Sequence, residues 1–87
     1  MDREVKEIKE VAKKFSPEQI EACITQQIDT GENVCLEDGT SEKIINELAK
    51  AEVVRSLIEN GMSLADALRE LARRMRLVQS GFMDEEQ

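Results

Sequence analysis

Histidine, tryptophan and tyrosine are absent from this 87-residue chain, and its only aromatic residues are Phe15 and Phe82. Without histidine, a single chain cannot build a Ser-His-Asp or Cys-His catalytic centre, a histidine-ligated zinc site or a haem site with a histidine ligand. Because there are only two cysteines, a four-cysteine metal site is excluded as well. We therefore expect no bound metal and no cofactor, and a core built from aliphatic side chains and methionine.

The chain also lacks the local motifs of common enzyme classes. It has no glycine-rich phosphate loop, no nucleophile elbow and no paired carboxylates in an apolar stretch of sequence. A helical domain of this size has little room for a ligand pocket within one chain. We therefore predict that the protein is not an enzyme and has no catalytic residues.

Long hydrophobic runs are missing too. No window approaches the ~18 apolar residues of a membrane-spanning helix, and the N-terminal sequence MDRE lacks the apolar core of a signal peptide. These absences predict a cytoplasmic protein with no membrane partner. In the reducing cytosol, Cys23 and Cys35 are expected to be free thiols rather than a structural disulfide.

Charged and aliphatic residues dominate what is present. Charged residues make up 36% of the chain and apolar residues 40%, and 19 acidic against 12 basic side chains give a net charge of −7. The length predicts one domain, and a chain this short buries only ~60–65% of its unfolded surface. Such a domain often gains stability by burying a further face against a second copy or a partner.

Apolar spacing and capping signals predict two helices in the first third of the chain. One helical stripe with 3-4-3 spacing predicts a helix over about 2–15. Ser16 as N-cap, with Gln19 closing a capping box, predicts a second helix over about 17–30, which Gly31 ends. The stripe of the first helix is Val5, Ile8, Ala12 and Phe15, and that of the second is Ile20, Cys23, Ile24 and Ile28.

The remainder of the chain contains one irregular stretch and two further helices. Residues 31–40 carry the turn signal Asp38-Gly39, and their carboxylates do not follow the EF-hand pattern, so we expect a solvated acidic loop. Thr40 or Ser41 caps the next helix and Ser63 the last. The predicted fold class is therefore all-α, a compact four-helix domain with helices at about 2–15, 17–30, 41–60 and 64–79 and one irregular loop at 31–40. It forms a single helical domain over 1–80, followed by an acidic C-terminal tail at 81–87.

The third predicted helix is apolar on two opposite faces. Its first half places Ile44, Ile45 and Leu48 on one side, whereas its second half places its apolar residues nearly opposite. Either this helix is central and contacted from two directions, or one half docks on a second chain. We expect part of it to contribute to an interface. The candidate interface residues on this helix are Val53, Val54, Leu57 and Ile58.

The fourth predicted helix has one clean apolar seam with 4-3-4-3 spacing. This seam is typical of a core-facing helix, and it also fits a helix that pairs with its copy in a dimer. The two interpretations are compatible. The seam, also a candidate interface, consists of Leu64, Leu68, Leu71, Met75 and Val78.

Basic side chains gather on the same helix. Arg69, Arg73 and Arg76 fall on one exposed strip. The strip is either a solvated helix face, where Glu70 pairs with Arg74, or a docking site for an acidic partner surface or a phosphate backbone.

The segment 55–64, RSLIENGMSL, followed by an Ala/Leu-rich helix, resembles the helix-turn-helix segments of some DNA-binding proteins. The resemblance implies a DNA-binding regulator that contacts DNA through its fourth helix. The net charge of −7 opposes attraction to phosphates, and the chain has no tryptophan or tyrosine for stacking on single strands. Binding to nucleic acid is therefore the alternative, not the main prediction.

The two cysteines have two interpretations. Free cysteine behaves as a small buried hydrophobe, so Cys23 and Cys35 are expected to be core residues. The alternative is a possible thiol pair that senses redox conditions. Their spacing matches no metal-binding signature.

Together these patterns predict a small acidic cytoplasmic helical protein that acts as a protein-interaction or regulatory adaptor, as a homodimer. The sequence does not identify a further protein partner. The alternatives are a helix-turn-helix-like DNA-binding regulator and a thiol-based redox sensor.

Overall fold

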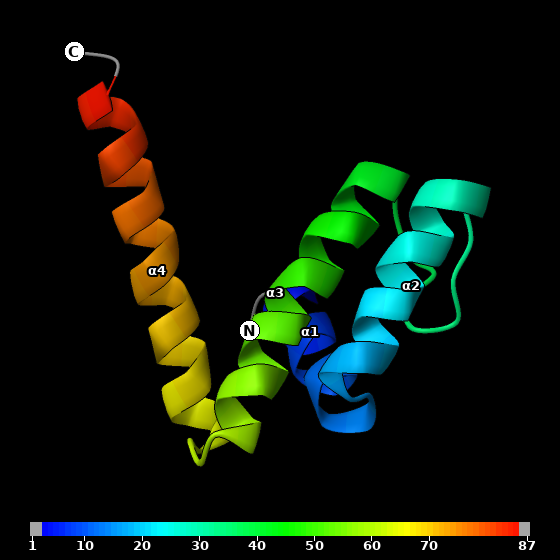
Figure 1. The fold of residues 1–87 in the computed structure, drawn as a ribbon, viewed down its shortest axis with the longest axis horizontal. Helices are drawn as coiled ribbons and strands as arrows, with labels where there is room; N and C mark the ends of the chain where they lie inside the picture. The colour runs from blue at the N-terminus through cyan, green and yellow to red at the C-terminus, as the bar shows by residue number, and fades with distance from the viewer. Residues whose placement is uncertain (1–2, 86–87) are drawn as a thin grey trace.

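In the computed structural model, which describes residues 3–85, the chain forms four α-helices and, within that range, no β-strand (Figure 1). They are α1 (Arg3–Lys14), α2 (Pro17–Thr30), α3 (Ser41–Glu59) and α4 (Leu64–Glu85). Side chains are described for residues 4–77. The predicted all-α class is confirmed, and the first three helices begin and end within one residue of the predicted positions.

Local signals place the first boundaries. The Ser16 hydroxyl accepts a hydrogen bond from the Gln19 backbone N–H at 3.2 Å, and the Gln19 side chain accepts one from the Ser16 N–H at 2.8 Å. This capping box satisfies two backbone donors at the start of α2. Gly31 ends α2 at φ 80°, a left-handed conformation that glycine adopts without steric cost.

Helix α3 is the central element, and it packs against α1, α2 and α4. Leu48, Ala51 and Val54 are fully buried along it. Neighbours on three sides explain why apolar residues occur on more than one face of this helix. The first of the two alternatives therefore holds, and the change of face requires no second chain.

The four α3 residues expected at an interface lie against the protein's own core. Val54 and Leu57 are buried within the chain, while Val53 and Ile58 are half-buried and pack on the same cluster. The physical reason is that α3 is covered from three directions by its own chain. These four residues therefore contribute to the core of the chain and not to an open docking surface.

Helix α2 buries most of the predicted stripe but not its last residue. Ile20 and Cys23 are buried and Ile24 packs on the core, but at the next turn Gln27 is buried, whereas Ile28 is 65% exposed. Gln27 faces inward because its side chain forms hydrogen bonds with Asn33 of the loop and with Ser41 at the start of α3. A buried amide with partners costs little, so a polar residue replaces isoleucine in the core stripe.

Helix α4 diverges from the other three (Figure 1). Its first half packs on α3 through Ala67 and Leu71, and beyond Leu71 none of its described side chains is buried. The predicted end at 79 is wrong, because the helix continues through Ser80 and Gly81 to Glu85. A glycine inside a helix costs only about 1 kcal/mol relative to alanine, so it does not by itself stop one. The predicted tail at 81–87 is thus helical as far as Glu85, and its last two residues lie outside the described range.

Candidate functional site

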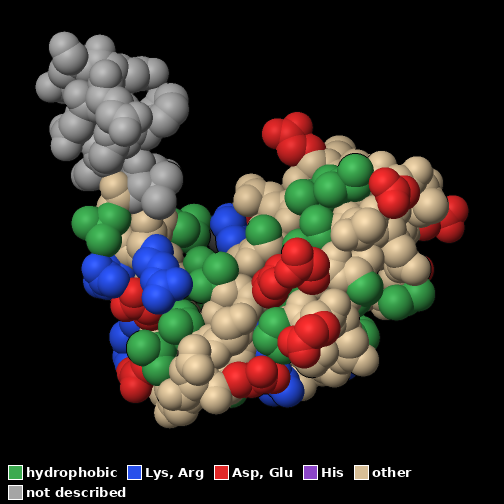
Figure 2. Space-filling model, viewed as in Figure 1, with side chains coloured by type: hydrophobic (Ala, Val, Ile, Leu, Met, Phe, Trp, Pro, Cys, Tyr) green, Lys and Arg blue, Asp and Glu red, His purple; other side chains and the backbone are tan. Residues whose placement is uncertain are grey.

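An open apolar groove of about 430 Å³ lies between the diverging α4 and the other helices. Helix α1 forms one wall and α4 the other, and three charged residues line the groove with them. Figure 2 shows apolar side chains gathered along the described part of α4, next to arginine and lysine. The apolar lining consists of Val5, Ile8, Leu68, Leu71, Ala72 and Met75, and the charged lining of Glu4, Lys50 and Arg76.

The predicted seam of α4 is only partly used within the chain. Leu71 is buried, Leu64 and Leu68 are half-buried, and Met75 is 38% exposed in the groove. The side chain of Val78, the fifth seam residue, lies outside the described residues. The seam therefore divides into a first half that packs on α3 and an outer part that faces the groove.

The arginine strip lies on the solvent side of α4. Arg69 pairs with Asp66 at 2.9 Å, and Arg73 pairs with Glu70 at 2.6 Å, while Arg76 lines the groove. Hydrogen bonds from Arg73 and then Arg74 lower the pKa of Glu70 to about 2.

Two of the three strip residues, Arg69 and Arg73, thus form local ion pairs. Arg74 also pairs with Glu70, at 2.8 Å. The predicted Glu70–Arg74 contact is confirmed. Exposed pairs of this kind contribute little to stability, so they hold Arg69 and Arg73 only weakly.

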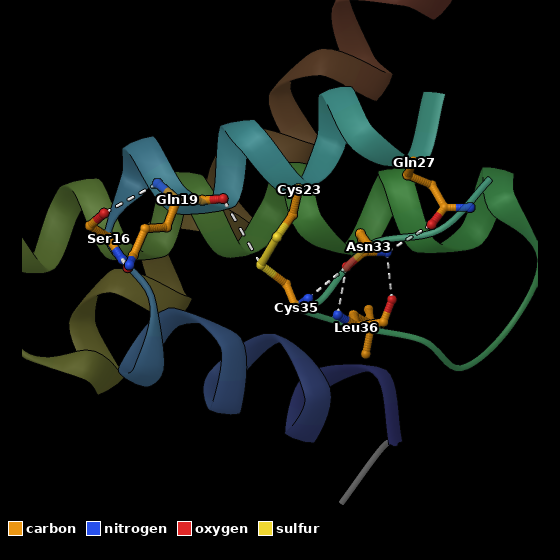
Figure 3. Close-up of a disulfide and its surroundings, with 7 residues drawn as sticks. All are labelled: Ser16, Gln19, Cys23, Gln27, Asn33, Cys35 and Leu36. Atoms are coloured by element: carbon orange, nitrogen blue, oxygen red, sulfur yellow. Dashed lines mark hydrogen bonds between the residues drawn. A yellow bond between two sulfur atoms is a disulfide. The ribbon is translucent and has the colours of Figure 1, made fainter. Parts of the chain in front are cut away.

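The two cysteines are joined in a disulfide, which corrects the expectation of reduced thiols (Figure 3). The Cα atoms of Cys23 and Cys35 are 6.2 Å apart, although the residues are 12 apart in sequence. The turn at Gly31 reverses the chain, so the loop runs back beside α2 and brings Cys35 to Cys23. Cys23 is 3% exposed, whereas Cys35 is half-buried. Sequence spacing could not reveal this, because it did not fix the path of the loop.

Asn33 organises the same loop, and the sequence analysis missed it. Its side-chain N–H groups donate to the Gln27 amide oxygen and to the Leu36 carbonyl, both at 2.7 Å. Its oxygen accepts from the backbone N–H groups of Cys35 and Leu36, both at 2.8 Å. Gln27 in turn donates to the Ser41 hydroxyl at 2.7 Å.

Asn33 is buried, so the loop at 31–40 is not the fully solvated segment that its acidic residues indicated. An asparagine placed between a helix-ending glycine and a cysteine was the available signal, since its side chain readily bonds to nearby backbone groups.

A second missed feature is a buried carboxyl pair that links α3 to α1. Glu47 is 1% exposed, and the carboxyl of Glu7 lies within hydrogen-bond reach of it. Burial, and then the neighbouring Glu7, raise the pKa of Glu47 to about 7. The two residues stand far apart among charged neighbours in the sequence, so no local motif marks them.

On another side of α3, the half-buried Glu52 meets Glu21 of α2. Burial, and then the hydrogen bond and charge of Glu21, raise the pKa of Glu52. Helix α3 thus presents a carboxyl group to each of the helices that precede it. An attractive contact also joins α3 to α1, because Lys50 pairs with Glu4 at 2.5 Å.

The described part of the chain holds no cluster of three or more cysteine or acidic side chains that could bind a metal ion. Nor does it contain a helix that is both long enough and apolar enough to cross a membrane. Comparison with protein-family models, with curated proteins and with solved structures gives no match.

Proposed function

We propose that the protein is a homodimeric protein-interaction adaptor, in which the α4 groove of one chain receives the outer half of α4 from a second copy. The single observation that carries this proposal is the divergence of α4. Past Leu71 the helix leaves the core while its apolar stripe continues into the groove at Met75. A second copy supplies the same groove and the same exposed Met75.

The two-fold symmetry of a dimer favours a second copy over an unrelated helix as the occupant of the groove. In a two-fold dimer the same patch serves both chains. Here α4 is both a wall of the groove and the element that would enter the partner's groove. Its 4-3-4-3 seam is the spacing with which paired helices interlock.

The arginine strip would stay accessible in such a dimer. Arg69 and Arg73 lie on the side of α4 opposite the seam, so the pairing of two seams leaves them in solvent. An adaptor needs a second surface of this kind, and an acidic protein surface is the partner that its charge fits. We retain the cytosol as the expected location.

The dimer is tested by sedimentation equilibrium of the full chain at micromolar concentration. We expect a dimer, and we expect Met75→Glu to raise its dissociation constant at least tenfold, because a carboxylate in the groove loses its hydration. About 1.4 kcal/mol suffices for that factor. Leu77→Glu is the matched control: Leu77 is 56% exposed on the same helix but does not line the groove. A well-folded monomer at all concentrations would refute the proposal, and equal weakening by both variants would show that the groove is not the interface.

A thiol-based sensor is the second candidate, and the bonded pair of cysteines favours it. Cytosolic disulfides are usually transient and act in catalysis or redox sensing. A reducing dithiol would attack the disulfide, passing two electrons and two protons to it; the protein would gain two thiols and the reagent would become a disulfide. Acid quenching and alkylation in cells, followed by mass spectrometry, would measure the oxidised fraction of Cys23 and Cys35. A fraction that follows added peroxide supports sensing, and one that never changes excludes it.

A further inference from the structure

Glu47 is among the largest fully buried side chains of this protein. It lies on the same helix as the fully buried Leu48 and Ala51, in the part of the molecule where water is excluded. Both of its carboxyl oxygens are enclosed, and neither accepts a hydrogen bond from a donor in the described residues. A charged carboxylate in such a place loses its hydration without compensation, which is costly.

The charged groups that face Glu47 do not supply the missing compensation. Helix α1 contributes Glu7 and Glu4, and its own helix contributes Lys43. Glu4 is paired with Lys50, and Lys43 is exposed to solvent. The nearest group is therefore another carboxyl, which as an anion can only accept hydrogen bonds and repel its neighbour. One proton turns this contact into a hydrogen bond between a carboxylic acid and a carboxylate.

We propose that the Glu7–Glu47 pair is a proton-controlled link between α1 and α3, which fastens the two helices when it holds a proton and loosens them when the proton leaves. The link consists of two carboxyl groups from different helices, and the Glu47 carboxyl is 1% exposed and accepts no hydrogen bond from a donor in the described residues. The proposal does not depend on the dimer.

The raised pKa of Glu47 sets the direction in which the stability of the fold changes with pH. Because the pKa of Glu47 is raised to about 7 in the folded protein, the folded state binds a proton more tightly than the unfolded state. The contribution to stability is complete below the ordinary glutamate pKa and is lost as the pH rises through about 7. Proteins whose carboxylates are salt-bridged behave in the opposite way and lose stability in acid.

The link also has a consequence for the α4 groove. Helix α1, which carries Glu7, supplies the groove wall formed by Val5 and Ile8. Loosening of α1 should therefore weaken the binding of a second copy's helix in the groove. This consequence, unlike the link itself, rests on the proposed dimer.

The experiment combines thermal unfolding with carbon NMR of the full chain. Between pH 5 and pH 8 we expect the melting temperature of the native protein to fall by roughly 10 °C, because most of the stability that the proton on Glu47 contributes is lost over this range. Glu47→Gln keeps the shape of the side chain and removes the ionisation. It should give a flatter profile and melt above the native protein at pH 8. Glu10→Gln, which removes an exposed carboxyl from α1, is the matched control and should retain the native profile.

Titration of the Glu47 carboxyl carbon, followed in the unmodified protein, is the decisive measurement and does not require any variant to fold. A midpoint near pH 7 supports the link, and a midpoint below pH 5 overturns it. A melting temperature that rises from pH 5 to pH 8, or an equal fall in Glu47→Gln, would also overturn it. If Glu47 titrates near pH 7 while the dimer dissociation constant stays the same, the link stands and its coupling to the groove is refuted. A monomer that shows the same titration would refute only the proposed function.

Discussion

Reduction of the Cys23–Cys35 disulfide is expected to destabilise the fold without unfolding it at room temperature. The bond closes a loop between residues 12 apart in sequence. A cross-link over a loop of that size removes chain entropy from the unfolded state worth about 3 kcal/mol. In a domain of this size the melting temperature should fall by roughly 15 °C.

The loop should keep its path after reduction, because the hydrogen bonds of Asn33 remain. One of them ties the loop to Gln27 of α2, and two others connect Asn33 to Cys35 and Leu36 within the loop; none of them requires the disulfide bond itself. Asn33→Ala would leave the buried Gln27 amide oxygen without this donor, which costs about 1–3 kcal/mol. Because both constraints act on one loop, their effects should not add, and combining them measures the coupling.

Urea unfolding followed by circular dichroism, with and without reductant, measures both effects. The variant with Cys23→Ala and Cys35→Ala serves as the control, because reductant must leave its stability unchanged. A loss below 1 kcal/mol on reduction of the native protein would refute the loop-entropy argument. An Asn33→Ala effect that simply adds to that of reduction would refute the predicted coupling, since it would show that the two constraints act independently.

Three further predictions concern the core, a helix cap and the second carboxyl contact. Leu48→Ala at the fully buried centre of α3 should cost about 2–5 kcal/mol in urea unfolding. Ser16→Ala removes the N-cap of α2 and should cost about 1 kcal/mol, which Ser16→Asp should largely restore. Glu52→Gln should raise the melting temperature at pH 8 more than at pH 4, because the pKa of Glu52 is raised in the folded state; an equal change at both pH values would contradict this.

The secondary structure could be predicted because its signals are local. The capping box at Ser16 and Gln19, the glycine at the end of α2 and the serine before α4 act within a few residues, so each can be read from neighbouring letters. The one boundary predicted wrongly is the end of the fourth helix, because Gly81 lies within α4 and does not terminate it. Helix continuation there depends on small differences in free energy, not on a single residue type.

The candidate sites could be predicted only in part, because they are formed by contacts between residues that are distant in sequence. The α3 positions expected at an interface turned out to lie against the protein's own core, since the pattern showed two apolar faces but not which chain covered them. The seam of α4 was recognisable, yet only its divergence from α3 shows that the seam is half-used. The disulfide and the Glu7–Glu47 contact had no local signature at all.

The sequence by itself determined that this chain is helical, where three of its helices begin and end, and that its core is aliphatic. Hydrogen bonding within a helix and the spacing of apolar residues along it extend over only a few positions, so they are encoded locally. The tertiary structure alone decided which apolar faces cover one another, which cysteine meets which, and which carboxyl loses its water. These depend on the path of the loop at 31–40 and on the angle at which α4 leaves α3, and both are set by packing among residues far apart in the chain.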